Sequence, residues 1–352
     1  MSSNPTDRRL HGLDLARLIA LVGMVIVNFD IVMVHAGDAV YASSRLAESL
    51  QGRAAATFVV LAGIGLGLAA RRGEWNYTFA VTVKRAVFLL VLGLLNSMIF
   101  EADIIHYYAV YFLFGALLLR APSFLLWCTI IALVVGFVAM ATVLDYARGW
   151  NWSELVYDDF WSPQGFLRNL FFNGWHPVVP WLAFLLFGIW LSRQKLRARP
   201  VQTTLAVAGT VTLLLTTAGS TLLIEYTQAS VPEAEWIFGT AAIPPMPLYM
   251  IAGGSAACLV IGLSLLLAPR LKSAGILDWL TPAGRQTLTL YIAHILIGMG
   301  LLEALGMIGG QTGELALLAA ALFCLMATVY AALWTRWFKR GPLEALMRRV
   351  AG

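Results

Sequence analysis

The stretch LDLARLIALVGMVIVNFDIVMV, Leu13–Val34, decides the fold class of this chain. It is apolar apart from a few polar side chains, and it is as long as the roughly 20 helical residues that cross the hydrocarbon core of a bilayer. Arg8 and Arg9 precede it, as basic residues precede the apolar part of a signal peptide, but no small-residue cleavage site follows. We therefore interpret the stretch as a first transmembrane helix that is retained in the protein.

The composition of the whole chain indicates many more such helices. Of its 352 residues 60% are hydrophobic and only 12% are charged, against about 45–50% and about 25% in soluble domains. A soluble fold of this size buries only about three quarters of its surface, so it could not hide this much apolar area. Aromatic residues make up 12% of the chain, which excludes a disordered protein. Lipid must cover the surplus.

Ten apolar stretches are candidates for spans, with the fourth and the sixth noticeably short. They are Leu13–Val34, Ala54–Ala70, Phe79–Phe100, Ile104–Leu119, Ser123–Leu144, Pro177–Leu191, Val201–Ile224, Leu248–Ala268, Thr287–Leu305 and Leu315–Trp337. We expect an all-α, polytopic integral membrane helix bundle of about ten transmembrane helices. No internal repeat and no separate soluble domain are found, so residues 1–352 are expected to form a single domain.

The basic residues predict the orientation of the bundle. With the N-terminus inside, 19 of the 24 Lys and Arg residues fall on cytoplasmic segments, and only Arg45, Arg53, Arg148 and Arg168 fall outside. Cytoplasmic loops of membrane proteins carry such an excess, so we expect both termini to be cytoplasmic. The same rule explains the net charge of +5 without nucleic acid, and no nucleic-acid partner is expected.

Polar side chains along the first span predict a functional face. Asp14 and Arg17 are one helical turn apart and can form an ion pair. Asn28 and His35 follow at whole numbers of turns, so the four residues share one face, with Asp30 close by. Ionisable groups inside a span are expensive and usually face the bundle interior. The ion pair alone can be structural, but a polar stripe across the full bilayer favours a function.

The histidines provide the remaining candidates. His294, in Tyr291-Ile292-Ala293-His294, lies halfway through the ninth span. His106 and His176 begin spans at the predicted outer face, where His35 also lies. Imidazoles at that face can act as a general base toward an external acceptor. We interpret His106 and His176, together with Trp181, as residues on the acceptor side.

Other motifs favour packing or remain ambiguous. Gly63 and Gly67 are spaced as in a GxxxG helix contact, and no strand precedes them as it would in a nucleotide loop. No Walker, HExxH or GxSxG motif occurs, which argues against an ATPase, a zincin or a serine hydrolase. The three cysteines lie in apolar runs and predict neither disulfides nor a metal site. The aromatic outer loop, residues 146–176, is either an interfacial anchor or a lid.

The polar motifs resemble those of one family. The opening Gly12-Leu13-Asp14-Leu15-Ala16-Arg17, followed by Val27-Asn28-Phe29, resembles the start of heparan-alpha-glucosaminide N-acetyltransferase and its bacterial relatives in the transmembrane acyltransferase superfamily. Gly284-Arg285 and Tyr291-x-x-His294 resemble the penultimate helix of that family. Gly341-Pro342-Leu343-Glu344 resembles the tail of uncharacterised bacterial membrane families in the same superfamily.

The resemblance implies an acyl transfer across the bilayer. The family takes an acyl group from cytosolic acyl-CoA and delivers it to an amino or hydroxyl group on the far side. An Asn and a His near the outer end of the first family helix are associated with that chemistry. Asn28 matches the Asn, and His35 matches the His with a shorter spacing. The resemblance identifies no acceptor, since relatives act on different glycans.

We therefore expect a membrane acyltransferase in the bacterial cytoplasmic (inner) membrane. Its catalytic candidates are His294, His35 and Asn28, with Asp14, Arg17, Asp30 and Tyr291 in support. The phosphates of acyl-CoA, expected to be acetyl-CoA, are assigned to the basic residues Arg71, Arg72, Arg193, Lys195 and Arg285, and the acceptor to His106, His176 and Trp181.

The expected partners are the lipid bilayer and a small-molecule or glycan acceptor, without a metal, and a homodimer is left open. The alternative is a proton-coupled transporter or flippase of a small polar or lipid-linked solute, in which Asp14, Arg17 and His294 relay protons. Inverted repeats would favour the transporter, and none is found. A purely structural scaffold explains the polar stripe poorly.

Overall fold

The computed structural model describes residues 9–34, 44–71 and 74–352, and helices dominate these residues. Every one of the ten predicted spans contains a helix, and the described residues include only two strands, β1 (Trp150–Asn151) and β2 (Val156–Tyr157). The predicted all-α class is confirmed.

Eight stretches in the described part of the chain are long and apolar enough to cross a membrane. They are His11–Val34, Arg45–Ala70, Trp75–Ser97, Ser123–Val143, Arg199–Thr227, Pro247–Ser273, Thr287–Ala304 and Gly313–Trp334. The count becomes nine if Pro163–Asn173 and Val178–Ser192, which meet at a bend of 50°, form one broken span. The fourth predicted span is a helix of only 14 residues. The protein is thus a multi-pass membrane protein, and the two spans expected to be short are the two that differ.

The chain divides into two compact units. Unit 1 comprises residues 1–58, 195–210 and 256–345, and unit 2 comprises residues 59–194, 211–255 and 346–352, within the described ranges. Four helices have residues in both units: α3 (Arg53–Ala70), α9 (Arg199–Thr227), α11 (Pro247–Ser273) and α16 (Pro342–Ala351).

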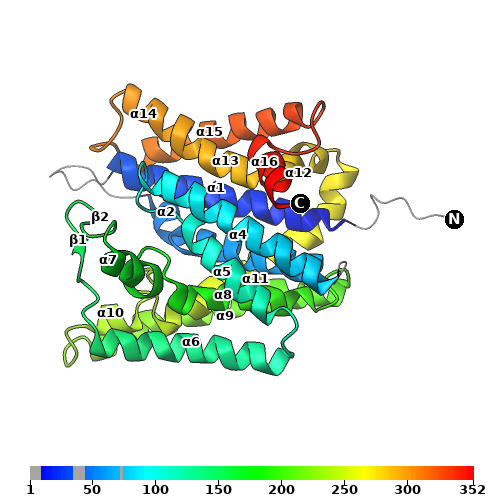
Figure 1. Ribbon diagram of the computed structural model, residues 1–352. Helices are drawn as coiled ribbons and strands as arrows, with labels where there is room; N and C mark the ends of the chain where they lie inside the picture. The colour runs from blue at the N-terminus through cyan, green and yellow to red at the C-terminus, as the bar shows by residue number, and fades with distance from the viewer. Residues whose placement is uncertain (1–8, 35–43, 72–73) are drawn as a thin grey trace. The chain divides into compact units, whose positions relative to one another are not determined.

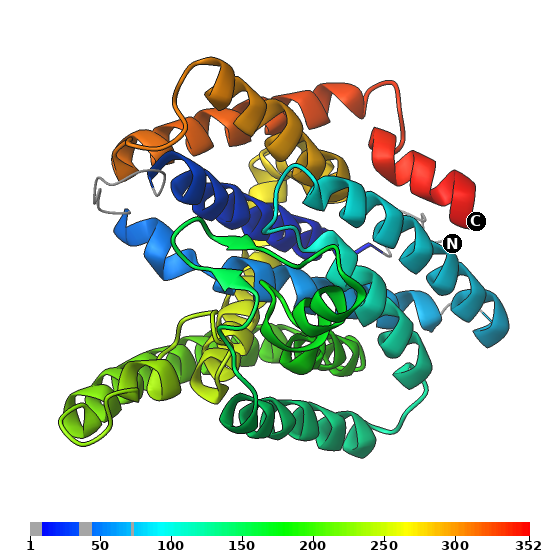
Figure 2. The same cartoon turned by 60° about the vertical axis from the view of Figure 1, so that its left-hand side comes forward.

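Unit 1 is organised around its first helix. Its own elements are α1 (His11–Val34), α2 (Arg45–Leu50), α12 (Leu277–Arg285), α13 (Thr287–Ala293), the π-helix η3 (His294–Met299), α14 (Gly300–Ala304) and α15 (Gly313–Trp334). Helix α1 packs against α12, α13 and α15, which lie side by side with it in Figures 1 and 2. Two-thirds of the residues in its apolar stretch are buried inside the protein, so α1 is a central helix of unit 1.

Glycines allow close backbone contacts of α1 in unit 1. A Cβ atom at Gly12 would overlap the backbone of Leu265, and one at Gly284 would overlap the backbone of Asp14. Small residues of this kind let membrane helices approach closely. Gly284 therefore fixes the distance between α12 and the turn of α1 that carries Asp14.

Unit 2 contains the remaining helices and the aromatic outer segment. Its own elements are α4 (Trp75–Ser97), α5 (Ile105–Leu118), α6 (Ser123–Val143), β1, β2, α7 (Pro163–Arg168), the π-helix η2 (Asn169–Asn173), α8 (Val178–Ser192) and α10 (Ala234–Phe238). Helix α5 packs against α4 and α8, and α8 packs against α6. The predicted GxxxG contact is present, because a Cβ at Gly63 would overlap the backbone of Leu185 and one at Gly67 would overlap Ser192.

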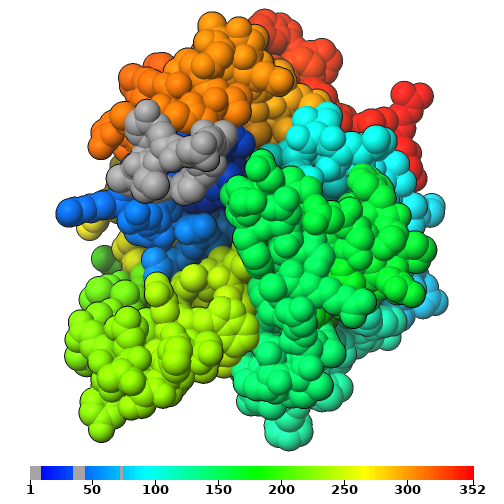
Figure 3. All heavy atoms as spheres, turned by 90° about the vertical axis from the view of Figure 1, so that its left-hand side faces the viewer, coloured from blue at the N-terminus to red at the C-terminus, as the bar shows by residue number. Residues whose placement is uncertain are grey.

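The aromatic segment between α6 and α8 is folded on itself. Strands β1 and β2 form a short antiparallel hairpin, drawn as green arrows in Figure 2, and the green atoms of this part form one continuous patch in Figure 3. Asn173 of η2 donates to the carbonyls of Tyr146 and Arg148 and accepts from the hydroxyl of Tyr157 at 2.7 Å. Buried hydrogen bonds thus hold the hairpin to η2.

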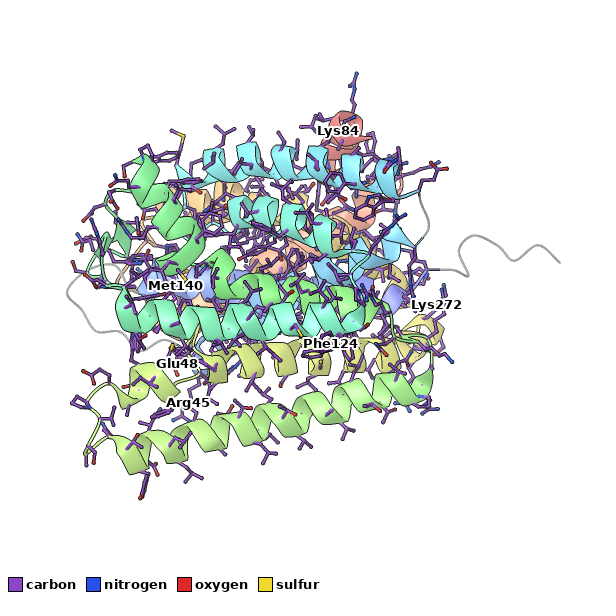
Figure 4. The ribbon with its side chains drawn as sticks, turned by 60° about the horizontal axis from the view of Figure 1, so that its bottom comes forward. Arg45, Glu48, Lys84, Phe124, Met140 and Lys272 are labelled. Carbon is purple, nitrogen blue, oxygen red and sulfur yellow. The ribbon has the colours of Figure 1, made fainter. Side chains whose placement is uncertain are left out.

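Lipid-facing side chains are most evident on α6. Only 11% of the residues in its apolar stretch are buried inside the protein. Phe124 is 79% exposed, and Figure 4 shows Phe124 and Met140 along this helix. Lys84 lies within α4. Its side chain projects outward in Figure 4, as expected for a long cationic side chain that reaches toward the interface.

Candidate functional site

A pair of polar side chains, the half-buried Asn28 and the buried His294, joins α1 to the ninth span within unit 1. Asn28 Nδ2 lies 3.0 Å from His294 Nε2, and the imidazole is fully buried. On the other side of the ring, Nδ1 is hydrogen-bonded to the carbonyl oxygen of Tyr291. The tyrosine ring packs edge-on against the imidazole, with centroids 4.8 Å apart.

These partners fix the tautomer of His294. A carbonyl oxygen only accepts hydrogen bonds, so Nδ1 must carry the proton. In the neutral ring Nε2 then holds a lone pair, and the amide of Asn28 must donate its N–H to that lone pair. One N–H and the oxygen of Asn28 remain for other partners. The pair is therefore oriented, with a basic nitrogen in contact with a side-chain amide.

The backbone at His294 departs from the regular α-helix. His294 is the first residue of η3, a π-helical segment that ends at Met299. Such segments are uncommon inside α-helices and are frequent at functional sites. A Cβ at Gly298 would meet the ring of Phe29 at 2.8 Å, so a glycine lets η3 pack beside the turn of α1 that carries Asn28.

The predicted ion pair of the first span is present, with a partner that the sequence analysis missed. Asp14 Oδ1 accepts from Arg17 at 2.8 Å, and Oδ2 accepts from Arg9 at 2.7 Å. The carboxylate is 2% exposed. Fourteen residues of helix separate Asp14 from Asn28, which corresponds to about 21 Å along α1. The ion cluster and the Asn28–His294 pair are thus separate features of one helix.

The other supporting residues have structural partners or lie outside the described residues. Asp30 is buried and accepts from the backbone N–H of Ser44 at 3.2 Å. Tyr291 contributes its carbonyl and its ring to the setting of His294. His35, the second predicted catalytic histidine, lies outside the described residues.

Two of the predicted acceptor-side residues, His106 and His176, have unsatisfied ring nitrogens inside unit 2. His106 Nδ1 lies 3.0 Å from Asp103 Oδ2, which also accepts from the backbone N–H of His106. Asn96 donates to the other carboxylate oxygen at 2.8 Å. Nε2 of His106 and Nδ1 of His176 are buried without a hydrogen-bond partner among the described residues.

Aromatic contacts connect these groups into one cluster with Trp181. The ring of Tyr107 lies 4.0 Å from that of His106 and 5.8 Å from that of His176, and His176 lies 4.7 Å from Trp181. Tyr111 donates its hydroxyl proton to the carbonyl of His176 at 2.5 Å. The fully buried indole N–H of Trp181 also lacks a partner in the described residues. Unit 2 therefore brings the three predicted residues together.

The basic residues assigned to acyl-CoA are not gathered within one unit. Arg71 and Arg193 belong to unit 2, whereas Lys195 and Arg285 belong to unit 1, and Arg72 lies outside the described residues. Arg71 donates to the carbonyl of Ser192 at 3.1 Å, and Arg193 donates to the carbonyls of residues 119 and 121. Part of their hydrogen-bonding capacity therefore holds the backbone of unit 2.

Sequence reasoning missed Asp103 and Arg9. Asp103 precedes His106 by three residues, the spacing at which neighbours in a helical turn meet, so this signal was readable. Arg9 pairs with Asp14 across five residues, from just before the helix begins. Among the described residues, no group of three or more His, Cys, Asp or Glu side chains is placed to hold a metal ion.

The fold is that of a multi-pass helical membrane protein, with an Asn28–His294 pair in unit 1 and a histidine-containing aromatic cluster in unit 2. Residues 9–230 match the family described as heparan-alpha-glucosaminide N-acetyltransferase, catalytic. Residues 187–352 match a family described as protein of unknown function, DUF418. No curated protein gives a significant match. The first match covers more than half of the chain, so the chain belongs to the heparan-alpha-glucosaminide N-acetyltransferase catalytic family and is a membrane acetyltransferase-like protein.

Proposed function

We propose that this protein transfers an acetyl or acyl group from cytosolic acyl-CoA, expected to be acetyl-CoA, to an amino or hydroxyl group of an extracytoplasmic acceptor. The observation that carries the proposal is the hydrogen bond that Asn28 Nδ2 donates to Nε2 of the buried His294. Membrane helices rarely carry an imidazole in the bundle interior without a function, because ionisable groups are expensive there.

The proposed chemistry uses both members of the pair. The N–H or O–H of the acceptor replaces Asn28 at His294 Nε2, and the ring takes the proton as the acceptor atom attacks the thioester carbonyl. The released amide of Asn28 donates to the carbonyl oxygen, where negative charge develops. The C–S bond then breaks, sulfur keeps the electron pair, and the thiolate takes up the proton, so that CoA leaves as the thiol.

The remaining residues receive supporting roles in this proposal. Arg285 and Lys195, the two predicted basic residues that belong to unit 1 as His294 does, are proposed to bind the phosphates of CoA, since basic side chains donate to phosphate oxygens. His106, His176 and Trp181 are proposed to bind the acceptor, because their buried nitrogens lack hydrogen-bond partners in the described residues. Unpaired buried polar atoms of this kind call for a ligand or a water molecule.

The central experiment measures transfer of a labelled acetyl group from acetyl-CoA to glucosamine or glycerol by purified protein in nanodiscs. Asn28→Ala and His294→Ala should lower the rate by roughly 10²–10⁴, while His11→Ala, a histidine at the start of α1 away from the pair, should leave it unchanged. CoA should also raise the unfolding temperature of the wild type. If CoA does not stabilise the wild type, and proton-coupled solute transport survives both substitutions, the protein is a transporter and not an acyltransferase.

The location in the inner membrane of a bacterium is part of the proposal and has its own test. Single cysteines replacing Trp152 and Glu233 should react with an impermeant thiol reagent in intact cells, whereas a cysteine replacing Lys195 should not. This pattern follows from the excess of basic residues on the segments assigned to the cytoplasm. Labelling of the cysteine at position 195 would show that the predicted orientation is wrong. The sides of the membrane assigned to acyl-CoA and to the acceptor would then be exchanged.

A further inference from the structure

The last helix, α16 (Pro342–Ala351), has an apolar face and a basic one. Leu343, Leu346, Met347 and Val350 are spaced by three and four residues, so they form one stripe along the helix. Arg348 and Arg349 flank that stripe on its two sides. Leu346 is 48% exposed and Val350 is 57% exposed, which leaves half of the apolar face uncovered by protein.

The position of α16 in the chain places it at a membrane surface. Ten residues of helix extend over only about 15 Å, half of the hydrocarbon thickness, so α16 cannot cross the bilayer. It begins eight residues after the spanning helix α15 ends at Trp334. Between them lie Trp337, which is 72% exposed, and Phe338, and exposed aromatic rings are typical of the lipid–water interface.

The charge around α16 favours an anionic surface. Lys339, Arg340, Arg348 and Arg349 carry four positive charges within eleven residues, and Glu344 is the only acid among them. The carboxylate of Glu344 is already engaged by backbone and hydroxyl donors, as described below. A short helix with an apolar face and several Lys or Arg residues lies in the interface and binds anionic lipids.

Glu344 connects α16 to the helix that leads to His294. Its Oε1 accepts from the backbone N–H groups of Leu288 at 2.8 Å and Thr289 at 3.1 Å, and its Oε2 accepts from the hydroxyl of Thr289 at 2.6 Å. The same hydroxyl accepts from the N–H of Leu343 at 3.0 Å. Leu288 and Thr289 form the first turn of α13, which continues directly into His294. The first turn of α16 is thus bonded to the first turn of α13.

We propose that α16 binds anionic phospholipid headgroups at the membrane surface and that this binding, transmitted by Glu344, sets the position of α13 and so the rate of acetyl transfer. The apolar stripe inserts among the acyl chains, and the four basic residues contact the phosphates. The regulatory part rests on the proposed function, whereas the lipid-binding part does not.

The test compares full-length protein in nanodiscs of neutral phosphatidylcholine with nanodiscs that also contain phosphatidylglycerol. Hydrogen–deuterium exchange of the backbone amides in residues 339–352 reports lipid binding without any activity. We expect slower exchange with the anionic lipid in the wild type and no such change in R348Q/R349Q. The variant R45Q/R148Q, which loses the same charge from exposed positions outside α16, should behave as the wild type does.

Activity in the same nanodiscs tests the connection. We expect anionic lipid to raise acetyl transfer several-fold in the wild type but not in R348Q/R349Q. E344Q should keep the lipid-dependent protection of residues 339–352 and lose the stimulation. Exchange that ignores lipid charge, or that slows only with protein concentration because a second copy covers α16, would overturn the proposal. If the protein shows no acetyl transfer in any lipid, only the proposed function is refuted. The hydrogen–deuterium exchange result still tests lipid binding by α16 independently.

Discussion

His294 in unit 1 and His106 in unit 2 are both buried, and each has its Nδ1 held by an acceptor three residues earlier in the chain. For His294 that acceptor is the backbone carbonyl of Tyr291, and for His106 it is the carboxylate of Asp103. The other nitrogen differs as well. Nε2 of His294 accepts from Asn28, whereas Nε2 of His106 has no partner among the described residues.

The comparison separates two kinds of buried imidazole. A carbonyl and an amide hold His294 in one neutral tautomer, in which the lone pair is available once Asn28 is displaced. At His106 the carboxylate of Asp103 accepts the hydrogen bond of Nδ1, so Nε2 holds a lone pair that no donor among the described residues occupies. The pair in unit 1 suits a step in which a proton is passed on, and the open lone pair of His106 suits the binding of a group that donates a hydrogen bond.

The largest effect is expected from Asn28→Asp, which gives His294 a carboxylate partner such as the one His106 has. A carboxylate only accepts, so Nε2 must carry a proton, and the lone pair that is proposed to receive the proton of the acceptor is lost. We expect acetyl transfer from acetyl-CoA to fall at least about 100-fold with little loss of folded protein. An Asn28→Asp enzyme with the rate of the wild type would contradict the role of the amide.

The second prediction compares the stability of the two pairs. Asp103→Ala removes the acceptor of three hydrogen bonds and should lower the free energy of unfolding by roughly 3–5 kcal/mol. Asn28→Ala removes one neutral hydrogen bond and should cost only about 1–3 kcal/mol. Reversible unfolding in mixed detergent micelles measures both. Equal losses in the free energy of unfolding would show that the carboxylate of Asp103 stabilises the fold around His106 no more than the amide of Asn28 stabilises the fold around His294.

The third prediction concerns the charged cluster of unit 1. Asp14→Ala leaves two guanidinium groups without a counter-charge and should cost roughly 3–5 kcal/mol. Arg17→Ala leaves the carboxylate paired with Arg9 and should cost about 1 kcal/mol, because the arginine is partly exposed. Unfolding of the single and double variants measures the coupling. Additive losses in Asp14→Ala/Arg17→Ala would mean that the two side chains do not interact.

The smallest effect is expected at Glu101, on the loop before Asp103. Burial raises the pKa of its carboxyl group, and the bond from the N–H of Tyr157 at 3.1 Å only partly offsets this. A carboxyl group whose pKa is raised in the folded state contributes stability at acidic pH, where it is protonated. That contribution is lost as the pH rises through the pKa of the folded state. Glu101→Gln should therefore gain about 0.5 kcal/mol or less over the wild type at pH 8, and nothing at pH 4. If the stability gained by Glu101→Gln instead grew as the pH fell, the pKa of Glu101 would be lowered rather than raised in the folded protein.

The sequence was sufficient for the long apolar helices and for the Asp14–Arg17 pair, but not for the short helices α2, α7, α10, α12 and α16. Apolar length predicted all eight stretches that can cross a membrane, because a backbone in lipid must be helical to satisfy its hydrogen bonds, but it also counted α5, which is too short for a span. The i,i+3 spacing predicted the Asp14–Arg17 pair. The Asn28–His294 bond joins residues that are 266 positions apart, and no periodicity reports such a contact. The bond of Glu344 to α13 and the π-helical pitch at His294 likewise depend on tertiary packing.

The π-helical turn at His294–Met299 has a consequence for evolutionary comparison. A π turn holds one residue more than an α turn, so it is equivalent to a single-residue insertion in the ninth span. Removing one residue from this segment would close the widened turn that carries Gly298 to the α pitch, while the register of the helix on either side would stay as it is. The length of this segment is therefore a marker, since family members shorter by one residue here are expected to lack the contact between η3 and the Asn28 turn of α1.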